Sequence, residues 1–322
     1  MTPVLRIATY HYVRDVAGTE WENLKVLSTA EFARQIDYCA ETFEVVSLDR
    51  ALDFLQGRYA ASRDLCLLAF DDGLREHFAI AAMLRDRNLS AAFFPITSCL
   101  DQETVAAVHQ NHLLMARLGV RVYRRKFMDR LNDIFPDFPA ELPDPEIAAR
   151  TYRWDDRETA EFKYLFNFAL PAAVQERVVA AVFRESIGAQ AEAARELYLS
   201  WSDLKEMRSW GMTIGGHTHT HRALSRLSPA EMKRELATCR RLLDQNLLEK
   251  DMEPQRNWPF SFPFGKRDSY TRETIEELRR LNFHCALTTQ DGGNAPGADL
   301  FQLRRTDCRD IPSCAPLSAS RA

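Results

Sequence analysis

The chain has 322 residues, which suits either two modest domains or one large α/β barrel with an addition. Hydrophobic residues make up 46% and charged residues 27%, a globular composition that excludes disordered and fibrous folds. The net charge of −4 disfavours binding to nucleic acid through bulk charge.

Three further features bear on the compartment of the protein. No run of about 18 apolar residues is present, so we expect no membrane span. Residues 1–6 lack the basic and apolar stretches of a secretory signal. The seven cysteines, the last of which is Cys314, include no C-x-x-C pair and favour reduced thiols. We therefore predict a cytoplasmic protein, with peripheral association with a membrane as an alternative.

The N-terminal part of the chain alternates strands and helices. Strands are predicted at 4–10, 64–70 and 91–96, with helices at 29–42, after Ser47, and ending near Asn88. This rhythm is typical of βαβ units and a parallel sheet.

The rhythm stops at about residue 101 and returns at residue 201. The residues between them predict helices near 103–118, 121–134, 156–169 and 171–187. Beyond them we expect helices at 201–210 and 270–281, and strands at 212–215, 258–263 and 284–288. Ser228, Pro229 and Glu231 form a capping box that predicts another helix start. The simplest interpretation is an α/β chain interrupted by a helical insertion.

Two polar segments directly follow predicted strands. Phe70-Asp71-Asp72-Gly73 places adjacent carboxylates at a strand end, where α/β folds hold their sites, although Asp-Gly alone is also typical of a turn. His217, His219 and His221 follow the strand at 212–215, and any two of them could bind a metal. An exposed polar loop is the alternative. Two histidines and one carboxylate leave open positions for water on a metal ion, and the second carboxylate could accept a proton. This set predicts a hydrolase.

These motifs carry a resemblance to a known family. Phe70-Asp71-Asp72-Gly73, His217-Thr218-x-x-His221 and Phe262-Pro263-Phe264-Gly265 resemble three motifs of the NodB-like polysaccharide deacetylases, carbohydrate esterase family 4. The similarity covers about 60–98 and 200–305. It implies a distorted barrel of about seven βα units, formed by residues 1–98 and 200–322 and interrupted by a helical insertion at 99–199.

The resemblance also implies roles for individual residues. Asp71 matches the catalytic base, whereas Asp72, His217 and His221 match the metal ligands. His219 falls on a variable position. The backbone N–H of Phe264 matches a donor to the substrate carbonyl, and its neighbours Pro263 and Gly265 are predicted to contact the substrate.

Two departures from the family pattern lead to further predictions. No arginine aligns with the one that orients the base, and we expect Arg305 to replace it or to contact the substrate. No histidine follows His284, so the general acid of many members has no C-terminal counterpart. Tyr10-His11-Tyr12 resembles a circularly permuted branch that includes poly-N-acetylglucosamine deacetylases, and His11 is therefore the predicted acid. A histidine packed at a strand end is the alternative.

The insertion follows a strand at the catalytic face and is predicted to act as a lid or specificity element. His109 and His112, three residues apart on its first helix, are predicted to line the pocket, with a structural or solvent-facing role as the alternative.

We therefore predict a metal-dependent hydrolase that uses metal-activated water to remove the N-acetyl group from an N-acetylated sugar or glycan. Zinc is the expected ion, with cobalt, nickel or manganese as alternatives. One alternative function is deacetylation or deformylation of a small, nucleotide-linked or lipid-linked amino sugar. A second is a non-catalytic relative that binds carbohydrate. No nucleic-acid partner is expected.

Overall fold

The computed structural model describes residues 2–138, 144–248 and 254–312, and its centre is a sheet of parallel strands. The strand order is β5-β4-β3-β1-β8, and the short β2 lies beside the start of β3. The bounds of these strands are Leu5–Tyr10 for β1, Glu44–Val45 for β2, Leu65–Asp72 for β3, Ala91–Pro95 for β4, Thr213–Ile214 for β5 and Thr306–Asp307 for β8. The prediction of an α/β fold on parallel strands is confirmed.

A second, two-stranded sheet contains β6 (Pro259–Ser261) and β7 (Cys285–Leu287), which are also parallel. Single parallel bridges connect it to both edges of the larger sheet: Gly216, just after β5, pairs with Phe260, and Leu287 pairs with Leu303, just before β8. The strands thus follow one another around a common centre. Gly215 shows how close they come, because a Cβ there would lie 2.6 Å from both the Phe94 ring and the carbonyl oxygen of Pro259.

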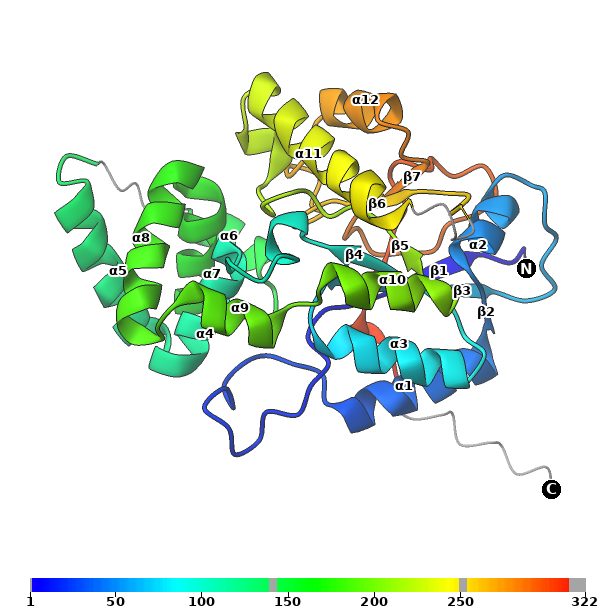
Figure 1. Cartoon of the computed structure of the whole chain (residues 1–322), viewed down its shortest axis with the longest axis horizontal. Coiled ribbons are helices and arrows are strands. Elements are labelled where there is room, and N and C mark those ends of the chain that lie inside the picture. Colours follow the sequence, from blue (N-terminus) through cyan, green and yellow to red (C-terminus); the bar gives the residue numbers. More distant parts are fainter. Residues whose placement is uncertain (1, 139–143, 249–253, 313–322) are drawn as a thin grey trace.

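The helices form two groups (Figure 1). One group surrounds the strands: α1 (Thr29–Thr42), α2 (Leu48–Leu55), α3 (Glu76–Asp86), α10 (Trp201–Ser209), α11 (Pro229–Leu247) and α12 (Arg272–Arg280). The other group, which we call the helical block (residues 107–197), lies to one side: α4 (Ala107–Leu118), α5 (Val120–Ile134), α6 (Pro145–Thr151), α7 (Arg157–Tyr164), α8 (Ala172–Ser186) and α9 (Gln190–Leu197). A π-helical turn, Leu165–Ala169, follows α7.

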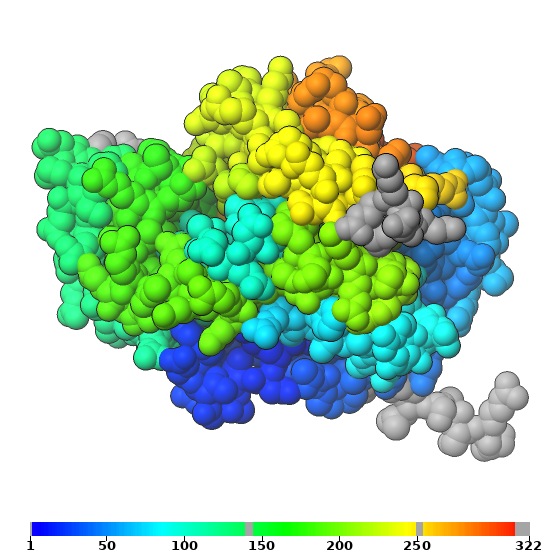
Figure 2. All heavy atoms as spheres, viewed as in Figure 1, coloured from blue at the N-terminus to red at the C-terminus, as the bar shows by residue number. Residues whose placement is uncertain are grey.

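The helical block has its own apolar cluster, which includes Tyr123, Phe127 and Phe166. Tyr12 and Leu24, from the segment after β1, belong to the same cluster, and Figure 2 shows this N-terminal segment (blue) against the block (green). The block therefore packs both on itself and on the chain that leaves β1.

Several element boundaries differ from the predictions. The elements β2, β8, α6 and α9 were not predicted, and the helix expected at 156–169 is divided into α7 and the π turn. The predicted capping box at Ser228 is present at the start of α11. Six cysteines are free, in agreement with the prediction, and Cys314 lies outside the described residues. None of the helices in the described part is long and apolar enough to cross a membrane.

Candidate active site

The alternation of side chains along the strands brings the polar residues together. Leu65, Leu67 and Ala69 of β3 belong to the apolar cluster between the strands, and Asp71 continues the same alternation. In the register of the sheet Tyr10 pairs with Phe70, so His11 follows β1 at the level of Asp71. Polar side chains therefore lie at the carboxyl ends of neighbouring strands. The two aspartates are the last residues of β3 rather than part of the turn after it.

Asp72, His217 and His221 form a cluster whose nearest ligand atoms all lie within 4.8 Å of one another. Oδ1 of Asp72 is 3.4 Å from Nε2 of His217 and 3.5 Å from Nε2 of His221. Two ligands held at about 2.1 Å by a tetrahedral ion lie about 3.4 Å apart, so these separations suit a metal better than direct hydrogen bonds. Oδ1 is also buried without a hydrogen-bond partner. The three residues fit a divalent cation.

The hydrogen bonding of His217 and the protonation of His221 support this fit. Nδ1–H of His217 donates to the carbonyl oxygen of Ser261 at 2.7 Å, which leaves Nε2 free as a ligand atom. Burial lowers the pKa of His221 to about 3, so its ring is neutral at neutral pH, whereas the carboxylates of Asp71 and Asp72 outweigh burial and raise the pKa of His217. His219 instead contacts the hydroxyl of Thr97 through Nδ1, at 3.1 Å, and is not part of the cluster.

Asp71 is held from one side only. Its Oδ2 accepts hydrogen bonds from the guanidinium of Arg305 at 2.8 Å and from the hydroxyl of Ser261 at 3.1 Å, whereas Oδ1 is buried without a partner. Burial raises the pKa of Asp71. The charges of Arg305, His217 and His11 lower it by more than burial raises it, so the net shift is downward. A carboxylate with one fixed and one free oxygen can accept a proton at the free oxygen.

His11, directly after β1, and Arg305, directly before β8, both lie beside Asp71; these are the two residues predicted to replace missing family residues. Arg305 is only 2% exposed and donates from Nε to the carbonyl oxygen of Thr288, so its side chain contacts protein groups and not the open site. His11 is half exposed, with Nε2 3.8 Å from Oδ2 of Asp71. The buried His77 donates from Nε2 to the carbonyl oxygen of His11 at 2.8 Å and so fixes its backbone.

The third motif forms a tight turn beside the site. Phe264 has a φ of 62° and Gly265 one of 59°, and a Cβ on Gly265 would lie 2.6 Å from the backbone nitrogen of Thr289. Thr289 donates to the carbonyl oxygens of both residues, at 2.8 and 2.9 Å. The ring of Phe264 lies 5.1 Å from that of the metal-ligand candidate His221. Pro263 is buried beside them.

His109 reaches the cluster from the helical block. It is completely buried, with Nε2 3.1 Å from Oδ2 of Asp72 and Nδ1 2.6 Å from the hydroxyl of Tyr198. His112 lies next to it, with ring centroids 6.0 Å apart, and touches Tyr12 rather than the cluster. Burial, with smaller contributions from Lys163 and His109, lowers the pKa of His112 well below its ordinary value.

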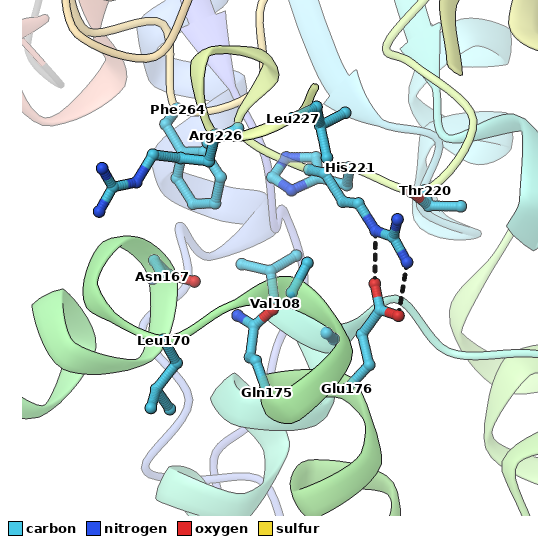
Figure 3. A pocket seen from close by; sticks show the side chains of 14 residues that line it. Val108, Asn167, Leu170, Gln175, Glu176, Thr220, His221, Arg226, Leu227 and Phe264 are labelled. Carbon is cyan, nitrogen blue, oxygen red and sulfur yellow. Dashed lines mark hydrogen bonds and ion pairs between the residues drawn. The ribbon is translucent and has the colours of Figure 1, made fainter. Parts of the chain in front are cut away.

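A pocket opens beside the cluster, where the helical block meets the loop after the histidine motif (Figure 3). His221 and Phe264 lie at its upper side, and Asn167 and Gln175 face them from the block. Glu176 of α8 forms two hydrogen bonds of 2.6 Å with Arg222. The remaining lining includes Val108, Leu170, Thr220, Arg226 and Leu227. None of Pro263, Gly265, Arg305, His109 and His112 is among the lining residues.

Sequence reasoning missed Ser261, His77 and Tyr198. Ser261 directly precedes the third motif and serves both Asp71 and His217, so its position was a usable signal. Nothing in the sequence marks His77 or Tyr198, because each acts through a partner far along the chain.

Comparisons with known proteins show what the chain is similar to in sequence and in fold. Residues 166–286 match the family model described as polysaccharide deacetylase. The curated protein YxkH of Bacillus subtilis (strain 168), which bears the name of the same family, is 27% identical over 108 residues. The matched region covers 34% of this chain and only 36% of that relative.

Solved structures show the same fold along nearly the whole chain. IcaB from Ammonifex degensii has a TM-score of 0.55 at 18% identity, with 95% of this chain and 92% of that chain covered. The deacetylase PplD of Streptococcus pyogenes has a TM-score of 0.57 at 15% identity, with coverages of 95% and 93%. A de-N-acetylase from Aggregatibacter actinomycetemcomitans has a TM-score of 0.56 at 15% identity, with coverages of 96% and 97%. The family model matches a region that holds two of the three motifs, so residues 166–286 are similar to the polysaccharide deacetylases, and the solved structures share the fold of this chain.

Proposed function

We propose that the protein hydrolyses the N-acetyl group of an N-acetylated amino sugar, alone or within a glycan. One observation carries the proposal: Asp71, a carboxylate with a free oxygen, is adjacent on β3 to Asp72, a member of the candidate metal cluster. Asp72, His217 and His221 would hold a divalent cation, for which we expect zinc. Bound there, the cation supplies Lewis acidity, which lowers the pKa of water and polarises an amide carbonyl.

Two residues would transfer protons, and three others would hold groups in place by hydrogen bonds. Asp71 accepts a proton from the attacking water on its free Oδ1, while Arg305 and Ser261 hold Oδ2. The N–H of Phe264 stabilises the carbonyl oxygen as negative charge develops on it. His11, half exposed beside Asp71, donates a proton to the leaving amine as the carbon–nitrogen bond breaks. The products are acetate and a free amino sugar.

We propose that the sugar lies in the pocket of Figure 3, so that the helical block acts as the specificity element. The pocket touches both His221 and Phe264, and Asn167 offers an amide oxygen that is buried without a partner. The charged Glu176 and Arg222 pair with each other, whereas Arg226 donates to the carbonyl oxygen of Phe168 and adds a positive charge to the lining. The lining is therefore compatible with a neutral sugar and with a nucleotide-linked one, and the substrate panel below distinguishes them.

The non-catalytic alternative loses its only support. It depended on the missing motif arginine, and Arg305 places a guanidinium on the base from another strand. Deformylation is an alternative acyl specificity of the same site.

Two measurements test the proposal. Acetate release from N-acetylated amino-sugar oligomers, monosaccharides and nucleotide sugars is expected in the presence of zinc and is lost after chelation. Asp71→Asn is expected to abolish turnover with zinc still bound. Full activity in that variant, or no release from any acylated sugar, would contradict the assignment.

A further inference from the structure

A chain of hydrogen bonds connects the helical block to the candidate metal ligand Asp72. His109 on α4 lies between Asp72 and Tyr198, which directly follows α9. An ionised carboxylate only accepts hydrogen bonds, so Nε2 of His109 carries the hydrogen and donates to Oδ2. Nδ1 then accepts from the hydroxyl of Tyr198.

Tyr198 is itself fixed. Its oxygen accepts a hydrogen bond from the backbone N–H of Ala106 at 3.1 Å, which directs its own hydrogen towards His109. Tyr198 is completely buried, and burial raises the pKa of its hydroxyl well above the ordinary value, so the proton stays on the oxygen. The ring of His109 is therefore held in one tautomer and one orientation.

The two oxygens of Asp72 have different environments as a result. Oδ2 receives His109, while Oδ1, which faces His217 and His221, has no hydrogen-bond partner. A hydrogen bond on the outer oxygen of a ligand carboxylate fixes its rotation and increases the fit of the inner oxygen to the ion.

The backbone just after Asp72 contacts the last residue of the block and the two residues that follow it. Leu74 pairs with Tyr198 in an antiparallel bridge. Leu199 donates to the carbonyl oxygen of Gly73 at 3.0 Å, and Arg75 donates to that of Leu197 at 2.9 Å. The chain at the end of the block thus holds the backbone just after Asp72. His109, near the start of the block, holds the side chain of Asp72.

We propose that the helical block prepares the metal site, with His109 as a positioning residue that orients Asp72 and Tyr198 as the group that orients His109. The proposal rests on the metal centre of the proposed function and goes beyond it. A segment expected to recognise the substrate is in this view also a determinant of metal affinity. His109 is predicted to act through Asp72 and not to touch the substrate.

The test is zinc affinity, measured by competition with a chromophoric chelator, together with the visible spectrum of the cobalt-loaded protein. His109→Leu is expected to weaken zinc binding about 10–100-fold and to alter the cobalt spectrum. His109→Gln keeps an N–H donor near Oδ2 and is expected to recover most of the affinity. Tyr198→Phe is expected to give an intermediate loss.

Gln110→Leu is the matched control, since Gln110 is the next residue on α4, is buried, and donates only to the carbonyl oxygen of Val105. Its zinc affinity should equal that of the parent protein. The proposal is overturned if folded His109→Leu binds zinc normally with an unchanged cobalt spectrum, or if Gln110→Leu loses as much affinity. If His109→Leu does not fold, equal zinc affinity in His109→Gln, Tyr198→Phe and the parent overturns the proposal instead. Failure of the parent protein to bind zinc would refute the proposed function itself.

Discussion

Replacing Arg305 by methionine removes the charge beside the proposed base while keeping most of the side-chain volume. Arg305 and Asp71 are each 2% exposed, and their 2.8 Å contact joins two buried charges. Removing one partner of such a pair leaves an uncompensated charge and destabilises a protein by about 3–5 kcal/mol. We expect a loss of that size in the free energy of unfolding at pH 7, measured by urea denaturation.

The same substitution shifts the pH dependence of catalysis. Burial alone raises the pKa of Asp71, and Arg305 is the largest of the opposing influences that bring it below the ordinary value. Without Arg305 the pKa rises, so a smaller fraction of Asp71 is ionised at a given pH. The acid limb of kcat/KM is therefore expected to move to higher pH. Because the pKa of Asp71 is lower in the folded protein, its ionisation stabilises the fold at pH values above the pKa of Asp71 in the unfolded chain. This stabilisation is lost as the pH falls through the pKa of Asp71 in the folded protein.

Two controls make the result specific. Arg305→Lys keeps a positive charge and is expected to retain a lower acid limb than Arg305→Met. Arg304→Met changes an exposed neighbour and should leave both the limb and the stability unchanged. An acid limb at the same pH in Arg305→Met and the parent protein would refute the role of Arg305 as the partner of the base.

Three further predictions concern other parts of the site. His11→Ala is expected to slow amide hydrolysis about 10²–10⁴-fold but to have little effect on an aryl acetate, whose leaving group needs no proton; equal losses on both substrates would contradict the assignment of the acid. Zinc at 100 times its dissociation constant should stabilise the fold by about 2.7 kcal/mol, so chelation should lower Tm, and an unchanged Tm would argue against a site in the folded protein. Gly265→Ala should reduce kcat and Tm together, because the new methyl group meets the backbone of Thr289; a variant with normal values would show that the turn can relax.

The predictable part of the site came from residues that are close in sequence. Asp71 and Asp72 are adjacent, and His217 and His221 lie within one loop, so each pair keeps its chemistry visible in a short motif. Once the motifs are placed at the ends of parallel strands, their proximity follows from the topology. The structure places all four together, as well as His11, which depended on the order of strands around the sheet.

The unpredicted part consists of contacts whose partners are far apart along the chain. His109 was noted only for its spacing from His112, and spacing cannot reveal that its partners are Asp72 and Tyr198. The helices α6 and α9 have seven and eight residues, which is too short for a clear apolar period. The two-residue strand β8 leaves no pattern either, although it directly follows Arg305.

The distribution of backbone strain identifies the site without reference to side-chain chemistry. Apart from glycines, seven described residues have positive φ, and four of them are at the site: Asp72, Thr218, His221 and Phe264. Each such conformation costs about 1–2 kcal/mol for a residue with a side chain. In the described part of the helical block positive φ occurs only at glycines, Gly119 and Gly188, where the cost is small. The fold avoids this cost in its packing helices but accepts it at a candidate metal ligand, a neighbouring turn and a proposed oxyanion donor. These residues are therefore held in that geometry by their surroundings. The hydrogen bonds from Thr289 to Phe264 and from His221 to the hydroxyl of Thr218 are two of the contacts that hold it.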